Sequence, residues 1–456
     1  MPLEGISMNF CNAWSLIAAT AAMVCLPITG GPAIAADAVI TAKPETPPMR
    51  SGETENKSVA SLTLAQALAL ALKHNPELSA FSHELRANEA TVLQAGALPN
   101  PVMDLTGDNL NNPRLRQDGD RTTSIQIGQL IELGGKRSAR IRVAETGRDL
   151  ANWDYEARRI DVLMQTSQYF IDTMAAQQAG QLAGESLRLA QEVAGAVAKR
   201  VLAGKVSPIE ETKARLALSA AQIETEQIRR QLTTARKNLA SMWADPEPAF
   251  ERVTGNLDAL PPLPEYAQLA ARIRNNPDLA RWNTEIARRQ AAVDAEKAKA
   301  VPDVTVSVGR TRFSQFEDHA YMLGISIPLP LFDRNRGGIL EAHRRLDKAG
   351  DEQRAAENRL LTALSQGFQR LGAIRSEVET LRADILPGAS SAYVGAAKGY
   401  QLGKFGILDV LDAQRTLFQA RTQYLKAVTD YHRGHNEIER LTGGPLGGTT
   451  PVTAKP

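Results

Sequence analysis

The chain has 456 residues, of which 43% are hydrophobic and 23% are charged, a balance typical of folded proteins and unlike that of disordered chains. Its formal net charge of +2 creates no strong field, so the composition gives no reason to expect a nucleic-acid partner. Aromatic residues make up only 5%, and the abundance of Ala, Leu, Gln, Glu and Arg favours long helices.

The first segment, residues 1–35, is interpreted as a cleaved signal peptide. An apolar run from Trp14 to Ile28 precedes Ala33-Ile34-Ala35, which fits the small-x-small cleavage rule. The run is too short for a membrane-spanning helix, although a retained N-terminal helix, a lipid anchor on Cys25 and a start at Met8 stay open as alternatives. Cys11 and Cys25 are the only cysteines. We therefore expect no disulfide and no cysteine metal site in the exported chain.

After a flexible leader at residues 36–61, the sequence is a tandem repeat. Asn75-Pro76-Glu77-Leu78 recurs as Asn276-Pro277-Asp278-Leu279 after 201 residues, and the segment around Gly204 recurs around Gly403 at nearly the same spacing. The predicted domains are repeats at 62–245 and 265–442, a linker at 246–264 and a disordered tail at 443–456.

Each repeat is predicted to begin with two helices separated by its Asn-Pro step, because helices usually stop before a proline. The expected helices are Leu64–His74 and Glu77–Ala97 in the first repeat, and Tyr266–Arg274 and Asp278–Ala300 in the second.

Two extended segments follow in each repeat, at about 101–110 and 122–133 and at about 302–313 and 319–331. Their side chains alternate: Val304, Val306 and Val308 share one face of a strand, with Thr305 and Ser307 opposite. Each segment has about the length of a tilted transmembrane strand, which is ~9–11 residues. Two ordinary hairpins packed on a helical core stay open as an alternative.

Four strands per chain cannot close a membrane barrel, because single-chain barrels of the outer membrane begin at eight strands. The open edges would be left unpaired in lipid. If the segments cross a membrane, the barrel must be shared, and the sequence predicts an oligomer. The fold class expected is mainly α, with a transmembrane β-barrel and long coiled helices.

The remaining part of each repeat is predicted to be a long helical hairpin. No proline occurs between Pro113 and Pro208, and roughly 65 helical residues there would extend on the order of 100 Å. Pro387 is expected to bend or break the corresponding helix of the second repeat. The last helix carries a heptad stripe typical of coiled coils: Val410, Leu417, Tyr424, Tyr431 and Ile438.

Both hairpins have a Gly-Lys turn at the tip, Gly204-Lys205 and Gly403-Lys404. Asp409 and Asp412 lie three residues apart on one helical face just after the second turn. They fit the acidic first turn that a helix dipole favours. Around the axis of an oligomer, they would instead form a ring of like charge that attracts cations.

No pattern of catalytic residues stands out. Gly134-Gly135-Lys136 lacks the spacing of a phosphate-binding loop, and no nucleophile is paired with a base. The i, i+3 pair His432 and His435 has no carboxylate or thiol in view and is a weak metal candidate. We expect no enzyme, no cofactor and no metal site.

Residues 62–443 resemble the TolC-type outer membrane efflux proteins, in the repeat, the Asn-Pro steps, the tips and the ending Ile438–Gly443. Ala97–Pro101 and Ile131–Arg137 look most like the CzcC-like channels of cobalt–zinc–cadmium exporters. The resemblance implies a homotrimer in outer-membrane lipid, with a twelve-stranded barrel above a helical tunnel through the periplasm. It also implies a periplasmic adaptor, an inner-membrane resistance-nodulation-division pump driven by protons, and passive conduction of divalent metal cations.

The resemblance further assigns Asp409 and Asp412 to the periplasmic gate. It assigns adaptor contacts to the tip residues Gly204, Lys205, Val206, Ser207, Gly403, Lys404, Phe405 and Gly406. Phe405 departs from the basic residue that some members carry, which puts an Asp–Arg latch there in doubt. Multidrug efflux or type I protein secretion through the same channel stays an alternative. A periplasmic adaptor or structural coiled coil is a further alternative.

Overall fold

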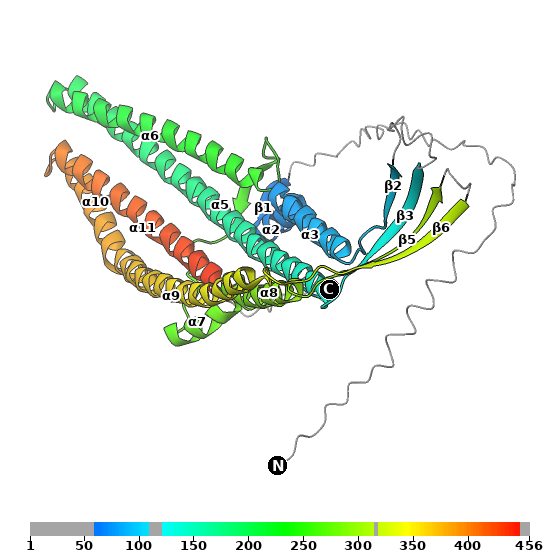
Figure 1. Cartoon of the computed structure of the whole chain (residues 1–456). Coiled ribbons are helices and arrows are strands. Elements are labelled where there is room, and N and C mark those ends of the chain that lie inside the picture. Colours follow the sequence, from blue (N-terminus) through cyan, green and yellow to red (C-terminus); the bar gives the residue numbers. More distant parts are fainter. Residues whose placement is uncertain (1–58, 109–120, 314–317, 447–456) are drawn as a thin grey trace, which may run out of the picture. The chain divides into compact units, whose positions relative to one another are not determined.

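The computed structural model describes residues 59–108, 121–313 and 318–446 (Figure 1). The expected signal peptide, most of the leader, the greater part of both polar strand loops and the last ten residues of the tail lie outside this part. Among the described residues, no helix is both long enough and apolar enough to cross a membrane.

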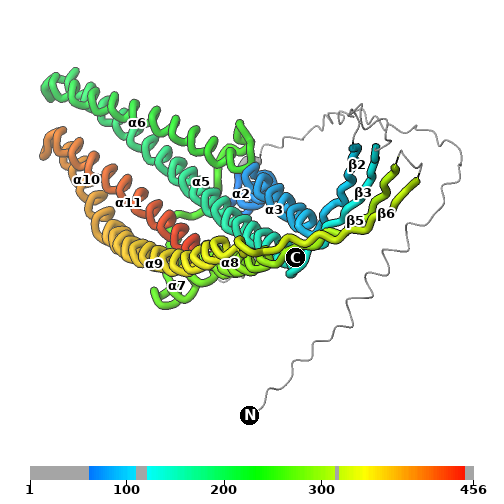
Figure 2. Tube along the Cα trace, viewed as in Figure 1, coloured from blue at the N-terminus to red at the C-terminus, as the bar shows by residue number. Residues whose placement is uncertain are grey.

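Helices and strands follow one another in the same order in the two repeats (Figure 2). The first repeat contains β1 (Val59–Thr63), α2 (Leu64–His74), α3 (Pro76–Ala95), β2 (Val102–Asp108), β3 (Thr122–Ile131), α5 (Lys136–Leu202) and α6 (Pro208–Ser241). The second contains β4 (Phe250–Thr254), α7 (Tyr266–Arg272), a short 3₁₀ turn (Ile273–Asn275), α8 (Pro277–Lys299), β5 (Val304–Phe313), β6 (Asp318–Ser326), α9 (Arg336–Thr380), α10 (Leu386–Gln401) and α11 (Ile407–Leu441).

The two Asn-Pro steps have the same structural role. The side-chain oxygen of Asn75 accepts hydrogen bonds from two N–H groups in the first turn of α3, at 2.9 and 3.1 Å, and its amide nitrogen donates to the carbonyl of Met242, directly after α6, at 2.9 Å. Asn276 caps α8 in the same way and donates to the carbonyls of Arg440 and Leu441 at the end of α11. Each asparagine therefore ties the beginning of its repeat to the end of that repeat.

The heptad stripe of α11 faces the other helices of the body. Val410, Leu417, Tyr431 and Ile438 are all buried, whereas Tyr424 is only partly buried. Tyr431 and Ile438 pack with Leu364 and Leu371 of α9. The coiled packing expected from the seven-residue spacing is therefore present within the chain.

Pro387 changes the helix geometry as expected. The helical hydrogen bonding of α9 ends at Thr380, and Leu381–Ile385 form a wider π-helical turn before α10 begins. Proline has no N–H to donate to the carbonyl four residues before it, and a wider turn is one way in which a helix accommodates that loss. The chain path bends in this region (Figure 2).

Two strands lie in segments that the sequence indicated to be a leader and a linker. β1 pairs in parallel with β4, from Val59 opposite Phe250 to Thr63 opposite Thr254. Parallel pairing between segments so far apart leaves no local hairpin signal, which explains why both strands were missed. The expected leader therefore becomes regular structure at Val59 and not after residue 61.

Several other boundaries differ from the prediction by a few residues. β6 ends at Ser326 and not near residue 331, because Pro328 and Pro330 cannot donate to a strand ladder. β3 ends at Ile131, two residues early. The first residues of the expected disordered tail are held in place: the backbone N–H of Leu446 donates to Glu439, and the carbonyl of Pro445 accepts from Arg272.

Candidate functional site

The four strands of the two repeats form one antiparallel sheet in the order β2-β3-β5-β6. Its central pair joins the repeats, because β3 of the first pairs with β5 of the second along their whole length, from Thr122 opposite Phe313 to Ile131 opposite Val304. Among the described strands, β2 and β6 each have a neighbour on one side only. The sheet therefore has two open edges.

One face of this sheet is apolar. Residues directly opposite each other on neighbouring strands point to the same face, so the pairing assigns every side chain. The apolar side chains of this face are Met103, Leu105, Ile125, Ile127, Ile131, Val304, Val306, Val308, Tyr321, Leu323 and Ile325, and the polar Gln129 lies among them. The polar face is lined mainly by Ser, Thr, Gly, Gln and Asp side chains.

Burial on the two faces is the reverse of that in a water-soluble sheet. Tyr321 and Leu323 are 80% and 78% exposed on the apolar face, whereas Thr311 on the polar face is 7% exposed. Its hydroxyl lies 2.9 Å from that of Ser124 on the adjacent strand. A face of this size and apolarity needs a nonaqueous neighbour, and a lipid bilayer supplies one.

The Gly-Gly-Lys sequence forms the junction between the sheet and the helices. Gly134 and Gly135 both have positive φ, +67° and +73°, and turn the chain from β3 into α5. A Cβ on Gly134 would lie 2.6 Å from the Cβ of Val301, so only glycine fits without a shift. The role of this motif is therefore structural: it forms the turn between β3 and α5 and not a phosphate-binding loop.

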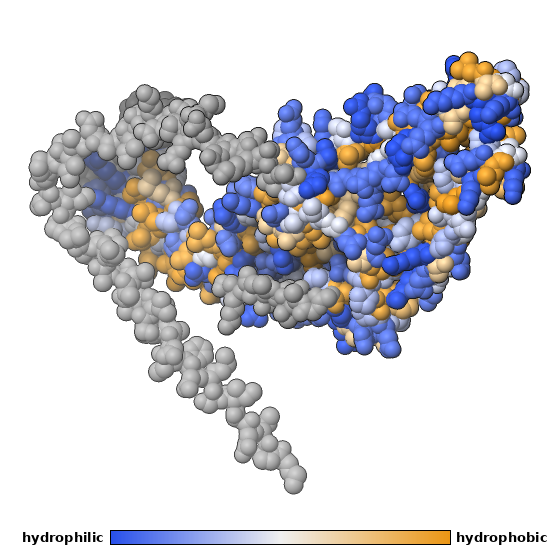
Figure 3. Space-filling view, turned by 180° about the vertical axis from the view of Figure 1, so that it is seen from behind, coloured by the Kyte–Doolittle hydropathy of each residue, from blue (hydrophilic) through white to orange (hydrophobic). Residues whose placement is uncertain are grey.

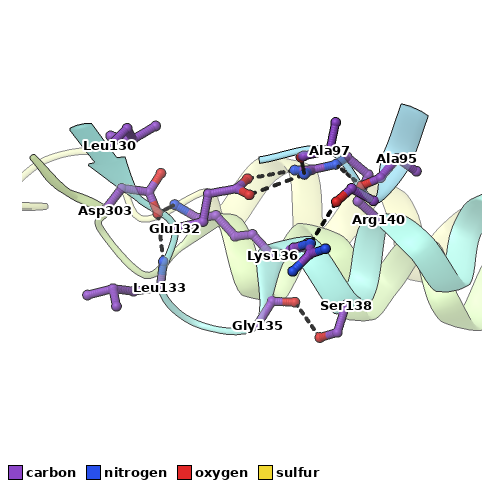
Figure 4. A network of polar contacts seen from close by, with 12 residues as sticks. Ala95, Ala97, Leu130, Glu132, Leu133, Gly135, Lys136, Ser138, Arg140 and Asp303 are labelled. Carbon is purple, nitrogen blue, oxygen red and sulfur yellow. Dashed lines mark hydrogen bonds and ion pairs between the residues drawn. The ribbon is translucent and has the colours of Figure 1, made fainter. Parts of the chain in front are cut away.

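Two ion pairs fasten this junction (Figure 4). Glu132 binds Arg140 in a two-pronged contact at 2.6 and 3.1 Å, and Arg140 also donates to the carbonyls of Ala95, the last residue of α3, and Ala97. The Asp303 carboxylate lies 2.7 Å from the Nζ of Lys136 and accepts from the backbone N–H of Leu133 at 3.0 Å (Figure 4). The start of α5 is thus linked to both hairpins of the sheet.

The charges at the junction hold both carboxyl groups ionised. The hydrogen bond from Arg140 lowers the pKa of Glu132 against the opposing effect of partial burial. Burial raises the pKa of Asp303, but the Lys136 ammonium and the Leu133 N–H outweigh it, and the net pKa is lowered. These contacts are therefore intact at neutral pH.

The two hairpin tips have closely similar turns. Gly204 and Gly403 adopt positive φ of +66° and +72°. The N–H of the following lysine then donates to a carbonyl five residues back, Lys205 to Arg200 at 2.9 Å and Lys404 to Gly399 at 2.8 Å. The two repeats therefore have equivalent hydrogen bonds at their tips as well as equivalent helices and strands.

The helices leading to the two tips also contact each other. The guanidinium of Arg200 lies 4.4 Å from the centre of the Tyr400 ring and donates to the Tyr400 carbonyl at 3.1 Å. Val197 and Ala214 of the first hairpin pack with Tyr400, Ile407 and Val410 of the second. The structure thus brings the two groups of predicted tip residues to the same end of the helical body.

The tips carry exposed apolar side chains (Figure 3). Leu202 is 89% exposed at the first tip, and Phe405 is 51% exposed at the second, where its ring covers Gly399. The other exposed apolar side chains near the tips are Ile209, Leu402 and Leu408. Such surfaces are typical of sites that contact other proteins.

Asp409 and Asp412 both lie on the surface at the start of α11, and each has a partner within the chain. The Asp409 carboxylate accepts from the backbone N–H of Gly406 at 2.9 Å and so caps the helix, a function that the hydroxyl of Ser207 serves in the first hairpin. Asp412 pairs with Arg415 at 2.6 Å. Neither carboxylate is buried.

Asp412 also lines a groove of about 790 Å³ between α6 and α11, and Ser186 and Ala190 of α5 line it as well. The α6 side is formed by small side chains such as Ala217 and Ala221, and the α11 side by larger ones such as Arg415 and Phe418. Within the described residues, no cluster of three or more His, Cys, Asp or Glu side chains could hold a metal ion. The Nε2 of His432 lies 2.8 Å from the carbonyl of Leu257.

Comparison with known families decides the assignment. The family described as "Outer membrane efflux protein" matches residues 67–245 and 270–444. This chain belongs to that family. The two matched segments correspond to the two repeats, which confirms the tandem duplication. This efflux protein therefore resides in the cell outer membrane and extends into the periplasm.

Several relatives of this efflux protein are known. The cobalt-zinc-cadmium resistance protein CzcC of Cupriavidus metallidurans is 39% identical over 382 residues, which cover 84% of this chain and 90% of CzcC. The nickel-cobalt-cadmium resistance protein NccC of Alcaligenes xylosoxydans xylosoxydans is 28% identical over 289 residues, 63% of this chain and 64% of NccC. Among solved structures, CusC superposes with a TM-score of 0.72 at 17% identity, over 84% of this chain and 92% of CusC.

Several residues of this efflux protein were not singled out from the sequence. Arg200 and Tyr400 lie 200 positions apart, Lys136 and Asp303 come from different repeats, and Glu132 meets Arg140 across the turn between β3 and α5. Their spacing follows no local period, so only the repeat could have drawn attention to them. Gly134 and Lys136 were recognised as a motif, but their junction role depends on Val301 and Asp303 from the second repeat.

Proposed function

We propose that the chain is the outer-membrane duct of a tripartite exporter of divalent heavy-metal cations, and that it works as a homotrimer. The observation that carries the proposal is a sheet with an exposed apolar face and two open edges, attached to two long helical hairpins. Lipid does not tolerate open edges, and pairing β6 of one copy with β2 of the next closes them. Three copies would give a twelve-stranded barrel.

The metal substrate is supported by the relatives. CzcC, NccC and CnrC are named for resistance to cobalt, zinc, cadmium or nickel. The pyoverdine export protein OpmQ of Pseudomonas putida shares 24% identity, compared with 39% for CzcC. Conduction would be passive, so selectivity and energy would come from an inner-membrane proton-driven pump of the resistance-nodulation-division type. A periplasmic adaptor would connect the pump to the duct.

Deleting the gene tests the substrate. The deletion strain is expected to become several-fold more sensitive to zinc, cobalt or cadmium salts, and the plasmid-borne chain should restore resistance. Growth in graded metal concentrations is the measurement, with a panel of dyes and detergents as the comparison. Sensitivity to the dyes alone would support multidrug efflux instead, and loss of an exported protein would support type I secretion.

The tip residues are proposed to contact the adaptor: Gly204, Lys205, Val206, Ser207, Gly403, Lys404, Phe405 and Gly406. Support comes from the exposed Leu202 and Phe405 side chains and from the joining of both tips through Arg200 and Tyr400. The two similar turns would offer the adaptor two similar contact sites in each subunit.

Asp409 and Asp412 are proposed to form the cation-attracting mouth of the duct. In a trimer, the first two turns of three α11 helices would place six carboxylates around one axis. Because Asp409 also caps α11, its replacement by alanine would change the tip structure as well as the charge. Asparagine keeps an oxygen that can accept from Gly406 while removing the charge.

The variant D409N/D412N should therefore lose cation preference while keeping its fold. Without the ring of charge, the reversal potential in a salt gradient is expected to shift toward that of an unselective pore, as measured in a planar bilayer. The matched control is D347N/D351N on α9, where both carboxylates are exposed and pair with an arginine three residues away. An unchanged reversal potential in D409N/D412N would exclude these residues from the mouth.

A further inference from the structure

Charge is divided unequally between the two faces of the sheet. The pairing places Arg310 beside Ile125 and Tyr321, and Arg312 beside Thr123 and His319. Arg310, Arg312 and His319 therefore continue the apolar face toward the loop end of the strands. We call these three residues the basic rim.

The acidic residues of the strands all lie on the opposite face. Asp104, Asp108 and Asp318 stand opposite Gln126, Thr122 and Phe313 in the register. No Asp or Glu occurs on the apolar face in the described strands. A random surface would mix both signs, so this separation requires an explanation.

The basic rim lacks a counter-charge within the described residues. Arg310, Arg312 and His319 are all exposed, and the side chains of the two arginines form no ion pair or hydrogen bond with any described residue. Several arginines of the helical body do have such a partner: Arg140, Arg433 and Arg440 each bind at least one carboxylate. The rim guanidinium groups are thus available to an external anion.

The depth of the rim points to the headgroup layer. The exposed apolar residues Ile327 and Leu329 extend the apolar face beyond β6. A fully extended chain from Leu329 to Tyr321 is roughly 26 Å long. Because barrel strands tilt by about 35–45°, this length covers about 20 Å along the membrane normal, which is most of the ~25 Å apolar band of outer-membrane barrels, and aromatic residues mark the borders of that band. Tyr321 lies at the border between the apolar face and the basic rim, since it pairs with Arg310. Because the helices extend into the periplasm, the loop end of the strands faces the outer leaflet.

We propose that Arg310, Arg312 and His319 bind the phosphate groups of an outer-leaflet lipid on the outside of the barrel wall. This inference rests on the proposed membrane insertion of the sheet. Arginine suits the task because its planar guanidinium binds two phosphate oxygens at once. A lipid headgroup would supply the missing counter-charge while its acyl chains cover Tyr321, Leu323 and Ile325.

The test uses the purified full chain in detergent, with bisphosphorylated lipid A as the probe and native mass spectrometry as the readout. The wild-type protein is expected to retain lipid A, and R310Q/R312Q to bind it at least tenfold more weakly. R310K/R312K keeps the charge but loses the two-pronged geometry, and it should fall between the two. R344Q/R345Q on α9 removes the same charge far from the sheet and should bind like wild type.

Two results would overturn the site. One is unchanged lipid A binding by R310Q/R312Q, and the other is equal binding of lipid A from which both phosphates have been removed. If inorganic phosphate competes with lipid A at equal concentration, the rim is an anion site and not a lipid site, which also contradicts the proposal. Planar-bilayer conductance of the same preparations separates the two proposals. A conducting R310Q/R312Q that binds lipid A normally refutes the rim alone, whereas a wild-type chain that never inserts refutes the duct and the rim together.

Discussion

Replacing Gly134 by alanine is expected to destabilise the folded chain by about 3 kcal/mol and to reduce the amount of assembled protein in the outer membrane. The left-handed backbone at φ +67° costs a residue with a Cβ roughly 1–2 kcal/mol. The new methyl would also lie 2.6 Å from the Val301 Cβ and 3.1 Å from the Ala298 carbonyl oxygen, and such overpacking costs about 1–3 kcal/mol. Thermal unfolding of the detergent-purified protein measures the loss.

Two glycine variants separate the causes of this effect. Gly204 has a similar φ of +66° but open space around its Cβ position, so G204A should show the backbone cost alone, about 1 kcal/mol. Gly147 lies inside α5 with no atom within 4 Å of its Cβ position, and G147A should be neutral or slightly stabilising. If G134A unfolds at the same temperature as G204A, the contact of the new methyl with Val301 does not contribute to the loss of stability.

Acidification is expected to destabilise the protein through His435. Burial of the ring and, secondarily, the neighbouring His432 lower the pKa of His435 to about 4, from an ordinary value near 6.5. The unfolded chain therefore takes up a proton at a higher pH than the folded chain. Stability is lost as the pH falls from about 6.5 toward 4, by about 2 kcal/mol at pH 5.

The variant H435Q removes this proton uptake. Its unfolding temperature should fall less than that of wild type between pH 7.5 and pH 5, whereas H343Q, at an exposed position on α9, should follow wild type. Glu439 lies 3.8 Å from His435, and burial raises its pKa, an effect that acts in the opposite direction. An identical pH dependence in H435Q and wild type would assign the acid sensitivity to other groups.

Local sequence patterns predicted most of the helical body. Asn75 and Asn276 marked the repeat because the same local cap occurs in both halves, and the stripe from Val410 to Ile438 marked the buried side of α11. The pairing of β1 with β4 was not predictable, because nothing near Val59 or Phe250 indicates a partner in the other repeat. The strand alternation predicted the faces of the sheet, but β6 ended earlier at its prolines.

The candidate sites were less accessible to sequence reasoning. Gly204 and Gly403 were found because a helix C-terminus commonly requires a glycine with positive φ, a local requirement. The alternation that places the valines of β5 on one strand face also places Arg310 and Arg312 there, but it does not show that they gather with a third basic residue. His319 joins them only through the register of β5 with β6. The capping role of Asp409 was likewise hidden, because its partner is a backbone N–H.

The pairing of β3 with β5 has a consequence for how the duct is assembled. The barrel of the proposed trimer contains six hairpins, and each must pair with the next, which makes six contacts between hairpins. The pairing of β3 with β5 makes three of these contacts intramolecular. A barrel built from single-repeat chains would need six copies, and all six contacts between hairpins would have to form between separate molecules. Covalent linkage replaces three of these encounters by a high local concentration. The duplication thus halves the number of strand registers that have to be found between separate molecules at the membrane.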